Sequence, residues 1–338
     1  MGDSTLRPLL SLVKPRIVAL LTLTGVTAAF AAGGLPPVQL VAFVAAGIGM
    51  AGGAAALNCY YDRDIDPEME RTADRPLATE AFPPWVALAV GVGLLAVATV
   101  VGLLALPLIS VGYMWLGVAS YVGLYTVLLK RRHWLGVVLG GSAGSFPVLA
   151  GWTAVHPVVV PTLPAWVMAA LVFVWTPAHA WALAVVYRDD FATVDIPTFP
   201  VVASPERTRQ AIWASALLTV ATAAALVPTA GPVYVGALLA GTGPFLLAYR
   251  QFHAVGTDAT AVRAFFSSNL YLAALFVGWA VDGTVTAGTA GGVATAIATV
   301  GLFLFVWSRR PSLRGVESSP IPDASGFLTR VYHRVVVP

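Results

Sequence analysis

The sequence predicts an all-α integral membrane protein, and three observations carry this prediction. Hydrophobic residues make up 58% of the 338 residues and charged residues only 10%, whereas roughly 25% of the residues in ordinary soluble domains are charged. The mean hydropathy is +0.82. The apolar runs are about 20 residues long, which is the length of a membrane-spanning helix rather than of a membrane β-strand.

Ten apolar segments predict a bundle of nine to ten transmembrane helices. Glycine and proline in the short links at 35–37, 107 and 231 are typical of tight turns, whereas the tenth segment begins with glycines that weaken it. We expect an N-terminal arm over 1–16, a membrane domain over 17–285, an extra transmembrane helix over 286–307 and a polar tail over 308–338. The ten segments are about 17–34, 38–57, 85–106, 108–129, 136–155, 164–186, 211–230, 232–250, 266–284 and 288–307.

The positions of the charges predict the orientation. If the N-terminus is cytoplasmic, all 19 Lys and Arg residues fall in inner segments or in the tail. Asp282 is then the only acidic residue near the outer side. Because positive charges concentrate on the cytoplasmic side of membrane proteins, we expect a multi-pass protein of the plasma membrane with a cytoplasmic N-terminus.

Small and aromatic residues distinguish three of the expected helices. Glycines and alanines crowd the second helix, and glycines recur at every fourth residue of the fifth, so both are suited to close helix packing. In the fourth helix, Tyr121 and Tyr125 share a face and could line a cavity. The KRRHW stretch at 130–134 ends that helix with inner positive charges.

The segment 58–76, NCYYDRDIDPEMERTADRP, concentrates the acidic residues. It holds six of the 16 acids in the chain, together with three arginines. Asn58, Asp62 and Asp66 follow one another at four-residue intervals, so on a helix they share one face. Pro67 disfavours helix at the residue before it, so we expect the helix to end near Asp66.

This ladder of oxygen ligands predicts a site for a metal-bound diphosphate. Mg²⁺ prefers carboxylate and carbonyl oxygens and commonly reaches proteins through one or two carboxylates plus substrate phosphates. Arg71 and Arg75 lie just beyond the ladder, and arginine binds phosphate oxygens bidentately. The alternative is a solvated loop whose charges neutralise one another; the regular spacing and a second acidic segment weigh against it.

The second acidic segment follows the sixth expected helix. Asp189, Asp190 and Asp195 come after an apolar span, as the first segment follows the second helix. Helices four apart run in the same direction, so both segments should reach one membrane face and could clamp one metal–diphosphate cluster. His179 lies eleven residues before Asp190, on nearly the same face of a continuous helix and about 16 Å deeper.

Several function classes lack support in the sequence. It contains no nucleotide-binding loop, no zinc-ligand spacing and no nucleic-acid signature. The single cysteine, Cys59, excludes an internal disulfide. A histidine deep in a bilayer is costly unless it is used or paired, so His179 is either a functional residue or a hydrogen-bonded structural one.

At this point the motifs resemble a known family. The chain is similar to the intramembrane aromatic prenyltransferases and, within them, to the protohaem IX farnesyltransferases (haem O synthases). The signal for the superfamily is N-x-x-x-D-x-x-x-D, and the signals for the haem branch are DRDID with E-R-T, W-T-P-x-H and I-P-x-x-P-V-V. The similar stretches are LVKPRI at 12–17, residues 58–77, LLKRR at 128–132, GGSAGSFPVLAGW at 140–152, residues 175–202 and residues 265–282.

The resemblance implies a helical bundle around a central cavity that two acidic cytoplasmic loops cap. It implies transfer of a farnesyl group from farnesyl diphosphate to a vinyl group of protohaem IX (haem B, a substrate and not a cofactor), which gives haem O. Mg²⁺ is the implied cofactor, and a downstream haem-modifying enzyme or a terminal oxidase is a possible partner beside the lipid bilayer; no nucleic acid is expected. The implied residues are Asp62, Asp66 and Asp190 as metal ligands, His179 as a further catalytic residue, and Asn58, Arg71, Arg75, Lys130, Tyr121, Tyr125 and Asp189 as substrate-binding residues.

The sequence departs from the family pattern, and alternatives stay open. Asp195 stands where the family often has glycine or asparagine, and Ala178 and Ala180 flank His179 where bulkier residues or proline are usual. One alternative is a prenyltransferase for a quinone precursor or another aromatic acceptor. The other is a secondary transporter, although transporter sites usually lie near the membrane midplane and these acids lie at its surface.

Overall fold

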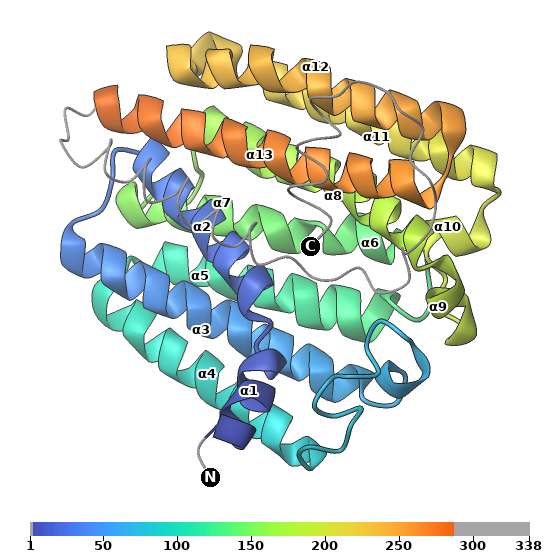
Figure 1. Ribbon diagram of the computed structural model, residues 1–338. Helices are drawn as coiled ribbons and strands as arrows, with labels where there is room; N and C mark the ends of the chain where they lie inside the picture. The colour runs from blue at the N-terminus through green and yellow to red at the C-terminus, as the bar shows by residue number, and fades with distance from the viewer. Residues whose placement is uncertain (1–2, 287–338) are drawn as a thin grey trace.

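The computed structural model describes residues 3–286, and all regular secondary structure in this range is helical (Figure 1). The long helices run side by side, and the chain turns at both ends of the bundle. The elements are α1 Asp3–Leu12, α2 Pro15–Ala31, α3 Pro37–Asp62, η1 Asp66–Glu68, α4 Pro84–Ala105, α5 Leu108–Val118, η2 Ala119–Leu129, α6 Leu135–Gly140, α7 Ser142–Val155, α8 Leu163–Val186, α9 Arg188–Thr193, α10 Phe199–Val202, α11 Pro205–Ala224, η3 Val227–Thr229, α12 Pro232–Val255 and α13 Asp258–Thr286.

The membrane-spanning segments agree with the sequence prediction. Eight helical segments of the described range are long and apolar enough to cross a membrane, and α2 is a shorter apolar helix. These nine correspond in order to the first nine predicted spans. The predicted tenth helix at 286–307 and the tail at 308–338 lie outside the described residues, apart from the last residue of α13 at position 286.

Helix α7 lies inside the bundle and packs against α2, α5 and α8, while α13 packs against α2, α8 and α12. Glycine permits the closest of these approaches: a Cβ on Gly151 of α7 would overlap the backbone of Gly25 in α2. Most of α7 is buried, including Val148, Leu149 and Thr153. Of the glycines that the sequence predicted to favour close packing, Gly53 of α3 does so, because a Cβ there would meet the backbone of Gly91 in α4.

The fourth predicted span is not one α-helix. Its first half is α5, and its second half, η2, is a π-helix of 11 residues. The π-type pattern is visible where the Lys130 backbone N–H donates to the Tyr125 carbonyl and the Thr126 hydroxyl donates to the Tyr121 carbonyl. π-helical segments are rare and frequently occur at functional sites, and η2 supplies side chains to the acidic segment.

Two boundary predictions are wrong. Helix α3 ends at Asp62, one turn before the predicted end near Asp66, because the chain turns through an Ile65 N–H bond to the Asp62 carbonyl. Pro67 lies at the start of the separate 3₁₀ turn η1. Helix α8 ends at Val186, and the backbone of Tyr187 leaves the helical region (φ −105°, ψ 28°), so His179 and Asp190 do not lie on one continuous helix.

The predicted N-terminal arm contains the short helix α1, whose last residue, Leu12, is fully buried beside Cys59. At the opposite end of the bundle, Asp282 accepts hydrogen bonds from the backbone N–H groups of Val233 (3.1 Å) and Tyr234 (2.8 Å) at the start of α12. A carboxylate there satisfies donors that a helix start leaves free and complements the helix dipole. Asp282 therefore has a structural function.

Candidate active site

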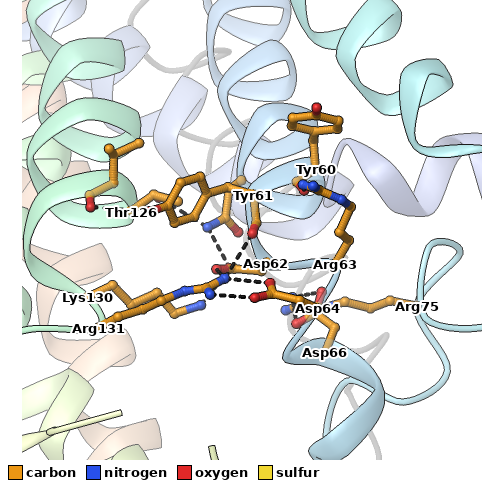
Figure 2. A network of polar contacts seen from close by, with 12 residues as sticks. Tyr60, Tyr61, Asp62, Arg63, Asp64, Asp66, Arg75, Thr126, Lys130 and Arg131 are labelled. Atoms are coloured by element: carbon orange, nitrogen blue, oxygen red, sulfur yellow. Dashed lines mark hydrogen bonds and ion pairs between the residues drawn. The ribbon is translucent and has the colours of Figure 1, made fainter. Parts of the chain in front are cut away.

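Asp62 forms the centre of the acidic segment at the end of α3. Its side chain is buried, and its Oδ2 accepts hydrogen bonds from Lys130 Nζ at 2.5 Å and Asn58 Nδ2 at 2.8 Å. Figure 2 shows Lys130 and Arg131 extending to this segment from the chain that follows η2. Burial lowers the pKa of Lys130 despite the opposing effect of Asp62. The pair is a buried ion pair, which requires good geometry to offset desolvation.

Asp66 is also fully buried, and it pairs with Arg75 from the same loop (Figure 2). Arg75 Nη1 lies 2.8 Å from Asp66 Oδ1 and 2.9 Å from Oδ2. Burial alone would lower the pKa of Arg75, but the contact with Asp66 more than offsets this and the net pKa is raised. The Thr72 hydroxyl donates to the Asp66 carbonyl and fixes the turn.

A third cation comes from the N-terminal segment. Lys14 Nζ donates to Asn58 Oδ1 at 2.5 Å, while Asn58 Nδ2 donates to the Thr126 hydroxyl at 3.1 Å as well as to Asp62. Lys14 has a left-handed backbone (φ 49°), a conformation that is uncommon for a residue with a side chain. Burial lowers the pKa of its amine to about 8, so Lys14 is a cation at neutral pH that titrates near the physiological range.

The second acidic segment docks on the loop of the first. The carboxylate of Asp190, in α9, accepts the backbone N–H groups of Glu70 (3.1 Å) and Arg71 (2.9 Å). This confirms that the two segments reach one end of the bundle, as Figure 1 also shows. Asp189 and Asp195 are exposed. Asp195 has a left-handed backbone (φ 54°), which explains why glycine or asparagine suits this position.

Arg71 forms no ion pair with an acidic side chain in the part of the chain that the structure describes. Its guanidinium lies over the rings of Tyr187 and Phe191, at 5.5 and 5.6 Å from their centroids. The buried Arg71 Nε has no hydrogen-bond partner. Burial, and next the charge of Arg75, lower the pKa of Arg71. An arginine with unused donors beside buried carboxylates is suited to a phosphate group.

The residues fit a divalent cation without enclosing one. Among the described residues, no group of three His, Cys, Asp or Glu side chains is close enough to hold a metal ion together. Asp62 Oδ1, however, is buried and accepts no hydrogen bond, and Arg131 Nη2 lies 3.8 Å from it. An orphaned carboxylate oxygen is costly inside a protein, so it is available to a metal ion.

Two cavities adjoin the acidic end of the bundle on different sides of α2. The α3-side cavity, of about 110 Å³, lies between α2, α3, α5 and α7 and is lined by Lys14, Tyr121 and apolar side chains. The α13-side cavity, of about 310 Å³, lies between α2, α7, α8 and α13 and is lined by His179 and Trp175. Ile17 and Leu21 line both cavities, so the cavities are neighbours.

The W-T-P-x-H stretch positions His179 within α8. Pro177 interrupts the hydrogen-bond ladder of α8, and Ser215 of α11 forms hydrogen bonds with backbone groups of α8 near this interruption. The Ser215 hydroxyl donates to the Val174 carbonyl at 2.7 Å and accepts the Ala178 N–H at 3.1 Å. Neighbouring hydroxyls commonly satisfy backbone groups that proline leaves free in membrane helices.

The structure brings together most of the predicted site residues. Tyr121 and Tyr125 stack at 6.0 Å between ring centroids beside the acidic segment, and Tyr121 reaches the α3-side cavity. The residues that the sequence predicted for the site do not include Lys14, Thr126 or Arg131, which contact Asn58, Asp62 or both. The LVKPRI and LLKRR stretches contain the two cations, but their position beside α3 depends on tertiary contacts. The residues that lie at or next to the acidic end are Asn58, Asp62, Asp66, Arg71, Arg75, Tyr121, Tyr125, Lys130, Asp189 and Asp190.

Curated relatives cover most of the chain. It is 42% identical over 281 residues to protoheme IX farnesyltransferase 1 of Saccharopolyspora erythraea, an alignment of 82% of this chain and 89% of that protein. It is 38% identical over 287 residues to the protoheme IX farnesyltransferase of Mycobacterium tuberculosis, with 83% and 92% covered.

Solved structures share the fold of this chain, and a family model shows to which protein family the chain belongs. A UbiA homolog from Aeropyrum pernix K1 has a TM-score of 0.63 at 22% identity, covering 82% of this chain and 99% of that one. A homolog from Archaeoglobus fulgidus bound to GPP and Mg²⁺ has a TM-score of 0.60 at 16% identity, with 80% and 98% covered. The model of the UbiA prenyltransferase family matches residues 18–270. The protein is therefore a multi-pass integral membrane protein that belongs to the UbiA prenyltransferase family.

Proposed function

We propose that the protein transfers a farnesyl group from farnesyl diphosphate to a vinyl group of protohaem IX and so forms haem O. We base the choice of substrates on sequence identity. The chain is 38–42% identical, over more than four fifths of its length, to proteins named protoheme IX farnesyltransferase. The two adjoining cavities support a reaction between two substrates, one on each side of α2.

The cations of the acidic end bind the diphosphate. Arg71 has free donors for a phosphate oxygen, and Lys14 lies at the α3-side cavity with its amine beside Asn58. Lys130 and Arg75 are held next to the same position by their carboxylate partners. Together these four side chains neutralise the charge that develops on the leaving diphosphate, which lowers the barrier to its departure.

Asp62, Asp66 and Asp190 are the residues that would hold Mg²⁺, with Asn58 and Asp189 as neighbours. The buried, unpartnered Oδ1 of Asp62 supports this assignment. When bound, Mg²⁺ supplies positive charge that stabilises the diphosphate leaving group. Asp190 also keeps the loop around Arg71 in place through its two backbone hydrogen bonds.

The α3-side cavity accommodates the prenyl chain. Its lining is almost entirely apolar, with Lys14 at one end and Phe43, Tyr113 and Ala150 farther along the bundle. Tyr121 and Tyr125 present stacked rings beside the reacting end, where aromatic faces stabilise an allylic cation. Apolar walls also delay the attack of water on that cation.

Water is the only further reactant that the balanced reaction needs. The bond between the farnesyl C1 and the diphosphate oxygen breaks, and the diphosphate keeps the electron pair. C1 then bonds to the terminal carbon of the vinyl group, and water adds to the resulting porphyrin-side cation and releases one proton. Ile17 and Leu21, which border both cavities, are the side chains between the two substrates.

The orientation is part of the proposal. All Lys and Arg residues before position 287 lie at the end of the bundle that carries the acidic loops, and the turns at the other end contain none. This distribution supports a cytoplasmic location for the N-terminus and for both acidic segments. A downstream haem-modifying enzyme or a terminal oxidase is the expected consumer of the product.

The test is one incubation with extracted haems weighed by mass spectrometry. Membranes containing the wild type, Asp62→Ala or Glu80→Gln receive protohaem, farnesyl diphosphate and Mg²⁺. We expect haem O from the wild type and from Glu80→Gln, which loses an exposed carboxylate of the same loop, and none from Asp62→Ala. Unmodified haem from a folded wild type, with prenylation of an aromatic acid, would favour the quinone-type alternative; flux of substrate without a covalent product would favour transport.

A further inference from the structure

We propose that His179 Nε2 is an axial ligand to the iron of the bound protohaem, and that Ser268 fixes the imidazole for this purpose. The inference rests on the proposed function, because protohaem is its acceptor substrate. It assigns the iron porphyrin to the α13-side cavity and gives a binding role to a histidine that the diphosphate chemistry does not use.

The cavity offers one metal-binding side chain. Its lining is apolar apart from a few residues, and its threonines donate their hydroxyls to carbonyls of their own helices. Of the described histidines, His179 alone lines either cavity. It lies seven residues before the end of α8, about 10 Å below the acidic end of the bundle. Imidazole nitrogen is a common ligand of haem iron.

The hydrogen-bond network determines which nitrogen is free. The Ser268 hydroxyl, which is fully buried, donates its one hydrogen to the Phe265 carbonyl at 2.7 Å. With that hydrogen on Phe265, the same oxygen accepts from His179 Nδ1 at 2.8 Å, and we assign the ring proton to Nδ1 on this basis. In that tautomer Nε2 keeps its lone pair and can bind a metal ion.

The imidazole is also held in a fixed plane. It stacks between Trp175, at 4.0 Å between ring centroids, and Phe265, at 4.3 Å. The Trp175 indole N–H donates to the Ser268 carbonyl at 3.1 Å, which ties this ring to α13. Metal-binding histidines characteristically donate their second N–H to a protein acceptor that sets tautomer and orientation, and Ser268 fulfils that condition.

Iron coordination would orient the acceptor. A porphyrin held through its iron can turn only about the Fe–N bond, so the cavity walls determine which edge faces Ile17 and Leu21. Loss of the ligand should therefore weaken haem binding and also change the position of the vinyl groups relative to the prenyl carbon. A histidine that only stabilised the contact between α8 and α13 would leave the electronic state of the iron unchanged.

The experiment titrates ferric protohaem into the purified full-length protein in lipid nanodiscs and records the Soret band and the electron paramagnetic resonance spectrum. We expect histidine-ligated iron in the wild type. In Ser268→Ala the haem affinity should fall roughly tenfold or more, and His179→Ala should lose the ligation signature altogether. Added imidazole should restore that signature in His179→Ala, which also shows that the cavity has folded.

Two controls separate the possible failures. In the first control, metal-free protoporphyrin IX should bind the wild type and His179→Ala equally. In the second, Asn269→Ala alters the same cavity and should keep the iron spectrum of the wild type. An unchanged iron spectrum in His179→Ala overturns the inference even when the wild type makes haem O. If the wild type ligates haem through His179 but never farnesylates it, the proposed function fails and the ligand assignment stands.

Discussion

Replacing Lys130 by methionine should destabilise the protein through the carboxylate that it leaves behind. Lys130 Nζ lies 2.5 Å from Asp62 Oδ2, and both side chains are buried. Methionine keeps most of the volume and removes the charge, so Asp62 retains Arg131, at 3.8 Å from its other oxygen, as the nearest cation. Breaking one partner of a buried ion pair costs about 3–5 kcal/mol.

The double variant Asp62→Asn/Lys130→Met separates stability from function. It removes both charges, and replacement of a complete buried pair is often close to neutral in stability. We therefore expect the double variant to unfold near the wild-type temperature and yet to make no haem O, because it lacks a carboxylate and a cation of the proposed site. Lys130→Met alone should be the least stable of the set.

The assay uses the single cysteine of the chain. Cys59 is buried at 2% exposure, one residue after Asn58, so a thiol-reactive fluorophore labels it as this region opens during heating in detergent. Arg132→Met is the matched control, because Arg132 is exposed and its printed hydrogen bonds go to the carbonyls of Val127 and Leu128, and surface substitutions of this kind change stability little. If Lys130→Met unfolds no earlier than this control, water reaches Asp62 and the buried-pair argument is refuted.

Three further predictions concern pH, a helix start and a helix contact. Burial lowers the pKa of Lys14 to about 8, so kcat/KM for farnesyl diphosphate should fall as pH rises through about 8. Lys14→Arg should move that fall to higher pH. Identical pH profiles of the two proteins would exclude Lys14 from diphosphate binding. Asp282→Ala removes the acceptor of two backbone N–H groups and should lower the free energy of unfolding in the Cys59 assay by about 1–3 kcal/mol. Asp282→Asn should have a smaller effect. If Asp282→Ala is as stable as the wild type, Asp282 does not cap the helix. Gly151→Ala places a methyl group against the α2 backbone and should lower the free energy of unfolding by about 1–3 kcal/mol. Gly112→Ala has open space around its Cβ and should leave the thermal unfolding unchanged. Equal effects of the two substitutions would contradict the close contact.

Helix positions were predictable because the membrane imposes a simple rule. A span needs about 20 apolar residues, so the apolar runs located the first nine spans, although α13 begins at Asp258, eight residues before the predicted start, and α11 at Pro205, six before. The end of α3 was not predictable at the same level. Pro67 indicates that a helix must stop before it, but the actual end at Asp62 depends on Arg75, Lys130 and the turn through Ile65, which come together only in the folded chain.

The site was predictable in its residue types and only partly in its contacts. Four-residue spacing placed Asn58 and Asp62 on one face, and their side chains do bond at 2.8 Å. The π-helix that carries Thr126 and leads to Lys130 has no signal in the sequence, because ordinary helix-forming residues occupy it. The Ser268 contact to His179 spans 89 residues, so no local pattern could indicate it.

The cations of this site also stabilise it, besides the role in diphosphate binding that we propose for them. Lys130, Arg75 and Lys14 contact Asp62, Asp66 and Asn58 respectively, so each of these buried side chains has a positive neighbour. Buried carboxylates without such partners would be strongly destabilising. The three cations lie beside the residues that would hold Mg²⁺, where they would add positive charge for a diphosphate. The same charges can therefore both stabilise the empty site and serve the proposed binding of the diphosphate.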